Sequence, residues 1–487
     1  MASLLSLPNE VLEQICQRFC PHCHLVLHPS TAFRQIHRDF NANVTPKGDL
    51  RSLALTNRRL RALAEPLLYH AMCLPKASAL RLLRTLSEQP QLQTHIKAVS
   101  LVWNTEGTQF EHDSGDSEPR LVNSLIKQRS DSIGREWALP VQPQYTHWGK
   151  SSPWIIREGY CSQGIVVALL LSMLPSLRYL RLQFDAAVLP PLEPGSLPEL
   201  LVFSSWTYGE VTVRKVLQAA PQVETLVYYG WFPKSQVRGE AVREVRLVGQ
   251  HDSWEDLGLL VASCPRTTSF SGQYAGDLFR FRGVNVVPSD IIPLLLPWKD
   301  TLTELRLGFD YFERDHPPNG CIVNDQWKGA TTIGCLKQFK ALKTLQIDAG
   351  LVAALDQAAK TWQKDATAQM RQDVLVDLLP ASIEYFLLQP PGTTSFSEAL
   401  RLLAAQRDTL FPLLKDVCTW NLEDEGEAMV SRAFSKVGTR FLGEPGDDSQ
   451  TSYICPYSKD PFARMDSVEF SCEERYREKA EHWHLEF

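Results

Sequence analysis

The chain has 487 residues, of which 44% are apolar and 22% charged, and both values are close to the average of globular proteins. This composition excludes a fibrous chain and a chain that is disordered throughout. A formal net charge of -6 provides no overall attraction to nucleic acid or to an anionic lipid surface, so we expect neither as a partner.

The apolar runs and the cysteines bear on the cellular compartment. The longest apolar run, residues 164–174, is shorter than the roughly 20 residues that cross a bilayer, so we expect a buried helix there and no membrane span. The N-terminal residues lack the basic start and the small-residue cleavage site of a secretion signal. Eleven cysteines, an odd number scattered along the chain, are typical of thiols in a reducing compartment. We therefore expect a protein of the cytoplasm or the nucleus.

Residues 1–75 differ from the rest of the chain in charge and pattern, with eight Lys/Arg and five Asp/Glu, a local charge of +3. A first helix is predicted from Pro8, which is tolerated in a first turn, with Glu10 placed favourably for the helix dipole. A second helical block covers residues 49–69, where Asp49 and Thr56 are candidate N-caps and Thr56 divides the block into two short helices. Three short helices cannot bury all of their leucines among themselves, so some of these leucines require a partner or the following domain.

Beyond residue 90 an apolar pattern recurs, in which apolar residues stand at positions 1, 4 and 6 of each copy. Its tail alternates as in a strand, and helix-like runs lie between the copies at 164–174, 212–220, 254–263, 291–296 and 373–379. Because strand, connection and helix repeat in one order, the strands are predicted to be parallel. The copies are Ile96-Val99-Leu101, Leu177-Leu180-Leu182, Leu197-Leu200-Val202, Val223-Leu226-Tyr228, Val242-Val245-Leu247, Leu302-Leu305-Leu307, Leu342-Leu345-Ile347 and Ile383-Phe386-Leu388.

The spacing of these copies predicts an irregular solenoid. Between Leu177 and Val242 the copies start 20, 26 and 19 residues apart, as in leucine-rich repeats, whereas from Leu302 on they start 40 and 41 residues apart. We predict an α/β solenoid of leucine-rich-repeat-like units over residues 76–442, preceded by the helical module at 1–75. A mobile loop is expected at 104–120, which is polar, acidic and nearly free of aliphatic residues, and residues 443–487 form a C-terminal tail.

The N-terminal module resembles a known motif. Residues 7–12 (LPNEVL) with Ile15, residues 53–60 (LALTNRRL) and residues 64–69 (AEPLLY) are similar to an F-box, and the last part is especially similar to F-box proteins of filamentous fungi. The resemblance covers residues 1–75, interrupted by an insertion at 20–48. It implies a three-helix module that docks onto the Skp-family adaptor of a cullin-RING ubiquitin ligase. By motif position, the implied adaptor contacts are Leu7, Pro8, Val11, Leu12, Ile15, Leu53, Leu55, Leu60 and Leu67.

Physical reasoning agrees with this assignment, but an alternative stays open. A standard interface buries about 1,600 Å² and has an apolar core, which surplus leucines on a small module can supply. The alternative is that these leucines cap the open end of the solenoid, since repeat arrays need capped ends.

One cluster in the insertion has the composition of a metal site. Cys20 and Cys23 form a Cys-x-x-Cys pair, and zinc sites combine such a pair with two further Cys or His ligands, here His24, His28 or His37. The alternative is that both cysteines seal the end of the first helix against the insertion. We favour the alternative and assign no metal ligands and no cofactor.

Motifs of catalysis are absent from the sequence. We find no nucleophile elbow, no zinc-protease motif and no phosphate-binding loop. The acid–base neighbours His251-Asp252 and Asp310 with His316 are typical of solvated loop residues. We therefore expect no enzymatic activity.

The residues that alternate with the buried positions of the strands are predicted to line the open, concave face of the solenoid. Tyrosine and arginine often anchor protein interfaces, so this row is a candidate surface for a target protein. The alternative is a solvated face on which Glu and Arg pair across strands. The candidate target-binding residues are Tyr179, Arg181, Tyr229, Arg246, Arg306, Gln346 and Tyr385.

Together these expectations describe a non-catalytic, substrate-recognition subunit of an SCF-type cullin-RING E3 ubiquitin ligase, which binds the adaptor, and through it a cullin, and holds an unidentified target protein. A scaffolding repeat protein without a ligase role is the alternative. A zinc-dependent enzyme at residues 20–37 is a third, weaker hypothesis.

Overall fold

The computed structural model describes most of the predicted strands and helices but only part of the connections. The predicted loop at 104–120, most of the insertion at 20–48 and all of the tail except Gly443 lie outside the described residues. The described residues are 6–20, 23, 47–74, 76–102, 124–128, 163–183, 189, 192–206, 210–229, 238–248, 254–275, 288–310, 333–348, 352, 372–389, 396–419, 422 and 424–443.

The chain divides into two compact units, residues 1–72 with 445–487 and residues 73–444. The N-terminal unit contains α1 (Asn9–Arg18), α4 (Lys47–Thr56) and α5 (Arg58–His70). Its core consists of the buried residues Cys16, Cys20, Leu50, Ala54, Ala64 and Leu67. Amphipathic helices of this length are held by such packing rather than by helix propensity.

The local signals at the starts of these helices differ in part from the predicted ones. Pro8 precedes α1 as its N-cap, and its carbonyl accepts the amide of Leu12 at 3.1 Å. The break after Thr56 lies where it was predicted, but the N-cap of α5 is Asn57, whose side chain accepts the amide of Leu60 at 2.9 Å. Thr56 instead donates back to the carbonyl of Ser52, also at 2.9 Å, and Asp49 lies inside the first turn of α4. The predicted caps Asp49 and Thr56 were therefore wrong.

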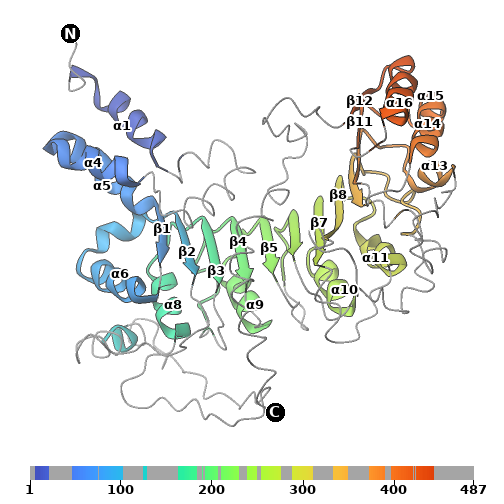
Figure 1. Cartoon of the computed structure of the whole chain (residues 1–487). Helices are drawn as coiled ribbons and strands as arrows, with labels where there is room; N and C mark the ends of the chain where they lie inside the picture. The colour runs from blue at the N-terminus through green and yellow to red at the C-terminus, as the bar shows by residue number, and fades with distance from the viewer. Residues whose placement is uncertain are drawn as a thin grey trace, which may run out of the picture. The chain divides into compact units, whose positions relative to one another are not determined.

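Apart from the first two residues of β1, the second unit contains a sheet whose strands follow one another in chain order (Figure 1). All pairings from β2 to β12 are parallel, and the strand order is β1 to β12 without a crossover. This confirms the predicted parallel α/β solenoid-like architecture. The strands are β1 (Ala71–Leu74), β2 (Ala98–Val102), β3 (Tyr179–Gln183), β4 (Val202–Trp206), β5 (Thr225–Tyr229), β6 (Glu244–Val248), β7 (Ser269–Ala275), β8 (Glu304–Asp310), β9 (Thr344–Asp348), β10 (Tyr385–Gln389), β11 (Asp416–Thr419) and β12 (Arg440–Leu442).

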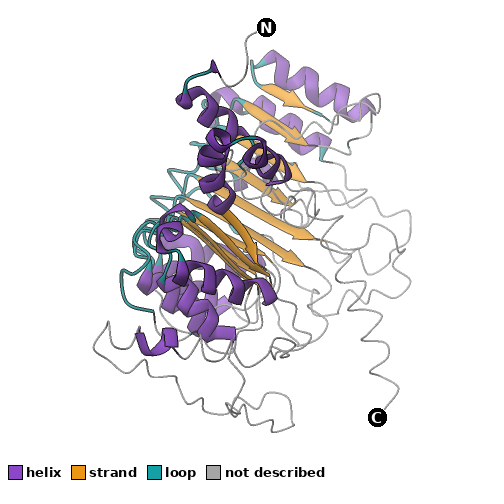
Figure 2. Ribbon diagram, turned by 90° about the vertical axis from the view of Figure 1, so that its left-hand side faces the viewer, coloured by secondary structure: helices purple, strands orange, loops and turns teal. Residues whose placement is uncertain are grey.

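Helices cover one face of this sheet (Figure 2). Between sheet and helices the inward side chains of neighbouring strands stack in rows, as in Leu180, Phe203, Leu226 and Val245, which are all buried. The helices of this unit include α6 (Lys76–Glu88), η2 (Pro90–His95), α8 (Gln163–Ser172), α9 (Glu210–Ala219), α10 (Trp254–Ser263), α11 (Pro288–Leu295), η4 (Leu296–Trp298), α13 (Val374–Leu378), α14 (Ser397–Ala405), α15 (Arg407–Leu410) and α16 (Asp424–Lys436). The apolar run at 164–174 accordingly forms the buried helix α8, as predicted.

One predicted repeat copy is out of register. The pairing of Leu180 with Phe203 shows that the inward positions of β4 are Phe203 and Ser205, preceded by Leu200, rather than the predicted Leu197-Leu200-Val202. Val202 pairs with Tyr179 and thus lies in the outward row of the sheet. The shift by three residues arose because Ser205 stands where the pattern requires an apolar residue, although Ser205 is fully buried.

Among the described residues, no helix has both the length and the apolar composition needed to span a bilayer.

Candidate functional site

Candidate sites lie on both units and are built from different chemistry. In the N-terminal unit, the nine residues at the F-box-like positions divide into three groups by exposure. Leu12, Leu60 and Leu67 are buried, Leu7, Ile15 and Leu53 are half-buried, and Pro8, Val11 and Leu55 are exposed.

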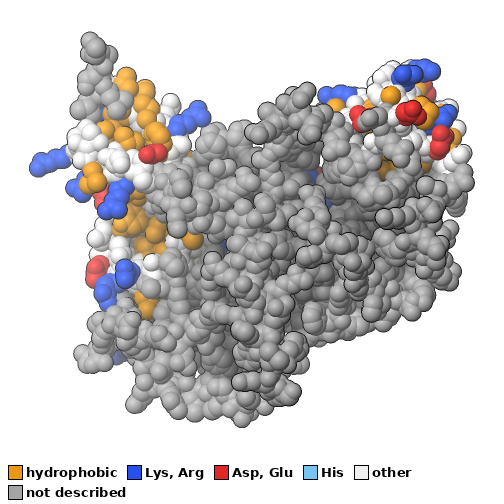
Figure 3. Space-filling view, viewed as in Figure 1, with side chains coloured by type: hydrophobic (Ala, Val, Ile, Leu, Met, Phe, Trp, Pro, Cys, Tyr) orange, Lys and Arg blue, Asp and Glu red, His pale blue; other side chains and the backbone are white. Residues whose placement is uncertain are grey.

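The exposure of these nine side chains separates the residues of the core from those that are available to a partner. Leu67 belongs to the core of the unit and Leu53 packs against it. Leu55 is 70% exposed and Val11 is 38% exposed. Apolar side chains gather over the N-terminal helices and are flanked by Lys and Arg side chains (Figure 3). Pro8, Val11 and Leu55 are hereafter called the exposed apolar set.

Arg59 ties the start of α1 to the start of α5. Its Nε donates to Asn9 Oδ1 at 2.7 Å, and its Nη2 donates to the carbonyl oxygen of Leu7 at 2.8 Å. Hydrogen bonds from a charged donor are stronger than neutral ones, so they hold residues 7–9 against α5 in one conformation. Sequence reasoning did not assign Arg59 this role, although Asn9 and Arg59 both lie within the quoted motif.

A second group in this unit is formed by two thiols and an imidazole. The Sγ atoms of Cys20 and Cys23 and a ring nitrogen of His70 all lie within 4.8 Å of one another. Cys23 Sγ is 3.4 Å from His70 Nδ1, and Cys20 Sγ is 3.7 Å from the carbonyl oxygen of Leu67. Cys20 is fully buried, whereas Cys23 and His70 are half-buried. We call these three residues the thiol–imidazole cluster.

The pKa values of the two thiols of the cluster are shifted in opposite directions. The hydrogen bond from Cys23, together with His70, lowers the pKa of Cys20 to about 5 despite its burial. The same hydrogen bond and burial raise the pKa of Cys23. By contrast, burial alone raises the pKa of Cys264 to about 12, as expected for a thiol among aliphatic neighbours.

Local sequence explains how the cluster assembles. α1 ends at Arg18, and Cys20 precedes Pro21, a position that disfavours helix. His70 is the last residue of α5, so both ligand segments lie at helix ends. The candidate ligands His24, His28 and His37 lie outside the described residues. His70 was missed in the sequence because it is 47 residues from Cys23. The signal that could have indicated it is the packing of α5 against α1, which brings the last residue of α5 to the end of α1.

In the second unit, the candidate target-binding residues lie on one face of the sheet. The register places Arg181, Arg246, Arg306 and Gln346 in one row, with Tyr179 and Tyr385 in the row beside it. These six side chains are half-buried or, in Arg181, buried at 7% exposure, and burial raises the pKa of Tyr179. Tyr229 lies on β5, but its side chain is outside the described part.

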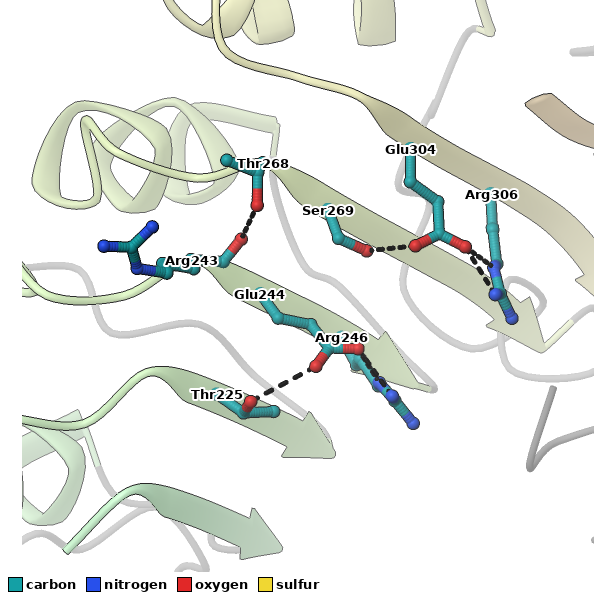
Figure 4. A network of polar contacts seen from close by, with 8 residues as sticks. All are labelled: Thr225, Arg243, Glu244, Arg246, Thr268, Ser269, Glu304 and Arg306. Carbon is teal, nitrogen blue, oxygen red and sulfur yellow. Dashed lines mark hydrogen bonds and ion pairs between the residues drawn. The ribbon is translucent and has the colours of Figure 1, made fainter. Parts of the chain in front are cut away.

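Two Glu–Arg pairs repeat on this face (Figure 4). Arg246 Nε donates to Glu244 Oε1 at 2.6 Å, and Arg306 Nε donates to Glu304 Oε1 at 2.8 Å. The other carboxylate oxygen accepts a hydroxyl from the preceding strand, Thr225 at 3.2 Å and Ser269 at 3.0 Å. The alternative of Glu–Arg pairing across strands therefore does not hold for these two pairs, because each ion pair lies within one strand and the hydroxyl bonds cross.

At the β2–β4 end of this row, buried polar groups surround Arg181. Ser100 and Ser204 pair with Arg181 in register and are 2% and 0% exposed. Neither hydroxyl has a hydrogen-bond partner in the described part of the chain. Arg181 Nη2 donates to Gln183 Oε1 at 2.9 Å.

A scan against models of protein families finds no match to the chain, and a search of curated proteins finds no significant relative.

Proposed function

We propose that this chain is the substrate-recognition subunit of an SCF-type cullin-RING ubiquitin ligase. In this role the N-terminal helices bind a Skp-family adaptor, and the strand face of the second unit binds a target protein. The chain itself makes and breaks no bonds. It raises the local concentration of the target near the conjugating enzyme and so makes the encounter effectively intramolecular.

The observation that carries the proposal is the exposed apolar set. A helical unit that buries three of its motif leucines leaves Leu55 70% exposed and Val11 38% exposed, at positions where the resemblance implies adaptor contacts. Leu12, Leu60 and Leu67 support the same unit from inside. A buried side chain does not reach a partner, so the adaptor contacts are proposed for Pro8, Val11 and Leu55, together with the half-buried Leu7, Ile15 and Leu53.

The target surface is proposed on the outward rows of β3 to β10. Arg246 and Arg306 present guanidinium groups that their own strand's glutamates already orient. Groups held in one rotamer lose less entropy on binding than free ones do. Tyr179 on β3, Gln346 on β9 and Tyr385 on β10 add aromatic and amide groups to the same face.

Co-purification tests the adaptor part. A Val11→Asp, Leu55→Asp double variant replaces two exposed side chains, so we expect it to fold. Leu413→Asp is the matched control, because Leu413 is 51% exposed and lies in the second unit. An uncompensated carboxylate in an apolar interface costs several kcal/mol, so we expect adaptor recovery to fall by about 100-fold or more in the double variant and to stay unchanged in the control.

The recovered proteins also separate the two candidate functions. Adaptor and cullin recovered together with the wild type, and lost together from the double variant, support the ligase role. Adaptor without cullin favours the scaffolding alternative. Equal recovery from wild type, double variant and control would refute the proposed docking surface.

A further inference from the structure

The thiol–imidazole cluster has the ligands and the spacing of a zinc site. Two segments that are far apart in sequence, the Cys20-x-x-Cys23 pair after α1 and the last residue of α5, bring two sulfurs and one imidazole nitrogen within 4.8 Å of one another. Among the described residues this is the one group of three or more Cys, His, Asp or Glu side chains so arranged. We propose that Cys20, Cys23 and His70 bind one Zn²⁺ ion.

The distances agree with a shared metal. With Zn–S bonds of about 2.3 Å, Zn–N bonds of about 2.0–2.1 Å and tetrahedral angles, sulfur and nitrogen atoms of one shell lie about 3.6 Å apart and two sulfurs about 3.8 Å apart. Cys23 Sγ and His70 Nδ1 are 3.4 Å apart, and the three ligand atoms span no more than 4.8 Å. Small side-chain rotations therefore suffice to complete three bonds to one ion.

The donor set selects the metal. Two thiolates and an imidazole suit zinc, whereas magnesium and calcium require oxygen ligands. Zinc is four-coordinate in such sites, so a fourth ligand beyond these three residues completes the shell.

Other thiols of the chain provide the contrast. Cys16, Cys264 and Cys418 are buried, yet none of them belongs to a group of metal-binding side chains in the described parts. A cysteine that only seals a helix end needs no histidine beside it. The position of His70 therefore changes the interpretation favoured by the sequence alone, in which Cys20 and Cys23 only sealed the end of the first helix.

The site would join the end of α1 to the end of α5. A metal that binds the folded unit and not the unfolded chain stabilises the fold, and it does so most where it closes a long loop. The ligands do not include any residue of the exposed apolar set, so this proposal does not depend on adaptor binding.

Zinc content tests the site on the full chain, purified under reducing conditions from cells supplied with Zn²⁺. We expect about one zinc per chain in the wild type and less than about 0.2 in Cys20→Ser, Cys23→Ser and His70→Ala. Cys335→Ser is the matched control, because Cys335 is an exposed thiol of the second unit, and we expect it to keep the wild-type content. His70→Ala is the most informative variant, since it leaves both thiols in place.

Two measurements on the wild type do not depend on how the variants fold. X-ray absorption of the zinc-loaded chain should show two sulfur and two nitrogen or oxygen neighbours. Replacement by Co²⁺ should give thiolate-to-cobalt charge transfer and a tetrahedral ligand-field spectrum. Wild-type protein that holds less than about 0.2 zinc after reconstitution, a shell without two sulfurs, or full zinc content in His70→Ala would overturn the proposal.

Discussion

Leu55 and Leu60 lie five residues apart on the two sides of the α4–α5 junction, and the structure exposes one and buries the other. Leu55 is 70% exposed and Leu60 is 2% exposed. Complete burial of a leucine side chain contributes about 1.5–3 kcal/mol, so covering the exposed part of Leu55 by a partner contributes about 1–2 kcal/mol. Leu55→Ala should therefore weaken adaptor binding by about 5- to 30-fold and change the free energy of unfolding by less than about 0.5 kcal/mol.

Leu60→Ala should instead change the free energy of unfolding more than it changes the adaptor affinity. Deletion of a buried leucine side chain removes its transfer free energy and leaves a cavity, which together cost about 2–5 kcal/mol. Calorimetric titration with purified adaptor measures the affinity, and urea unfolding measures the stability. Leu413→Ala, at 51% exposure on the second unit, is the control and should change neither quantity. Adaptor affinity equal to wild type in Leu55→Ala would refute the reasoning, because the exposed leucine would then have no partner to cover it.

Three further predictions concern the fold and its polar contacts. Trp298→Phe should lower the free energy of unfolding by about 1–3 kcal/mol in urea titrations, because the fully buried indole donates to the carbonyl of Cys264 at 2.8 Å and packs on Phe270; an unchanged midpoint would contradict this. Asn57→Ala should cost about 1 kcal/mol through loss of the cap of α5, seen as faster hydrogen exchange at the first turn of α5, and Asn57→Asp should restore protection. Hydrogen bonds from Lys415 and Lys343 lower the pKa of Glu384. The ionised carboxylate therefore stabilises the fold at pH values above the unfolded-state pKa of about 4.3. This contribution is lost as the pH falls through the lower, folded-state pKa. The stability difference between wild type and Glu384→Gln should accordingly be present at about pH 7 and shrink as the pH falls below the unfolded-state pKa of about 4.3, and a difference that stays constant in acid would show that the charge is not its cause.

The strands that the sequence revealed and those that it did not differ in their inward residues. β8 and β9 present Leu305, Leu307, Leu345 and Ile347, which satisfy the apolar pattern. β7 escaped notice because Thr267 and Gly272 stand at pattern positions around Phe270. Thr267 is nevertheless buried, since its hydroxyl donates to the carbonyl of Cys264 at 2.9 Å and needs no water.

β11 shows the same effect at the other end of the sheet, because Thr419 replaces the last apolar residue of the pattern and is 1% exposed. A pattern of apolar residues cannot find a strand whose buried positions are polar and internally hydrogen-bonded. β11 was found only through its pairing with β10 and β12, and β7 only through its pairing with β6 and β8.

The N-terminal unit shows a different limit of sequence reasoning. Leucines at helical spacing predict an amphipathic face, but which leucines meet inside depends on how the helices pack. Leu55 and Leu60 are equally apolar, and only the arrangement of α4 against α5 shows that one is exposed and the other buried. The partner of the Cys20-x-x-Cys23 pair was missed for the same reason, because His70 reaches the thiols through the fold and not through local spacing.

The Glu–Arg pairs bear on what kind of target the strand face can hold. Arg246 and Arg306 each direct Nε toward a glutamate of the same strand, and that carboxylate is held on its other side by a threonine or serine hydroxyl. An acidic target must therefore compete with an intramolecular carboxylate for that edge of each guanidinium, and the net attraction is smaller than two arginines alone would provide. The benefit is orientation, because the pairing holds two flat donor groups in one row, two strands apart. At about 4.8 Å per strand this sets a separation of about 10 Å, so a target bound on the proposed surface would be selected by the spacing of its acceptors more than by its total charge.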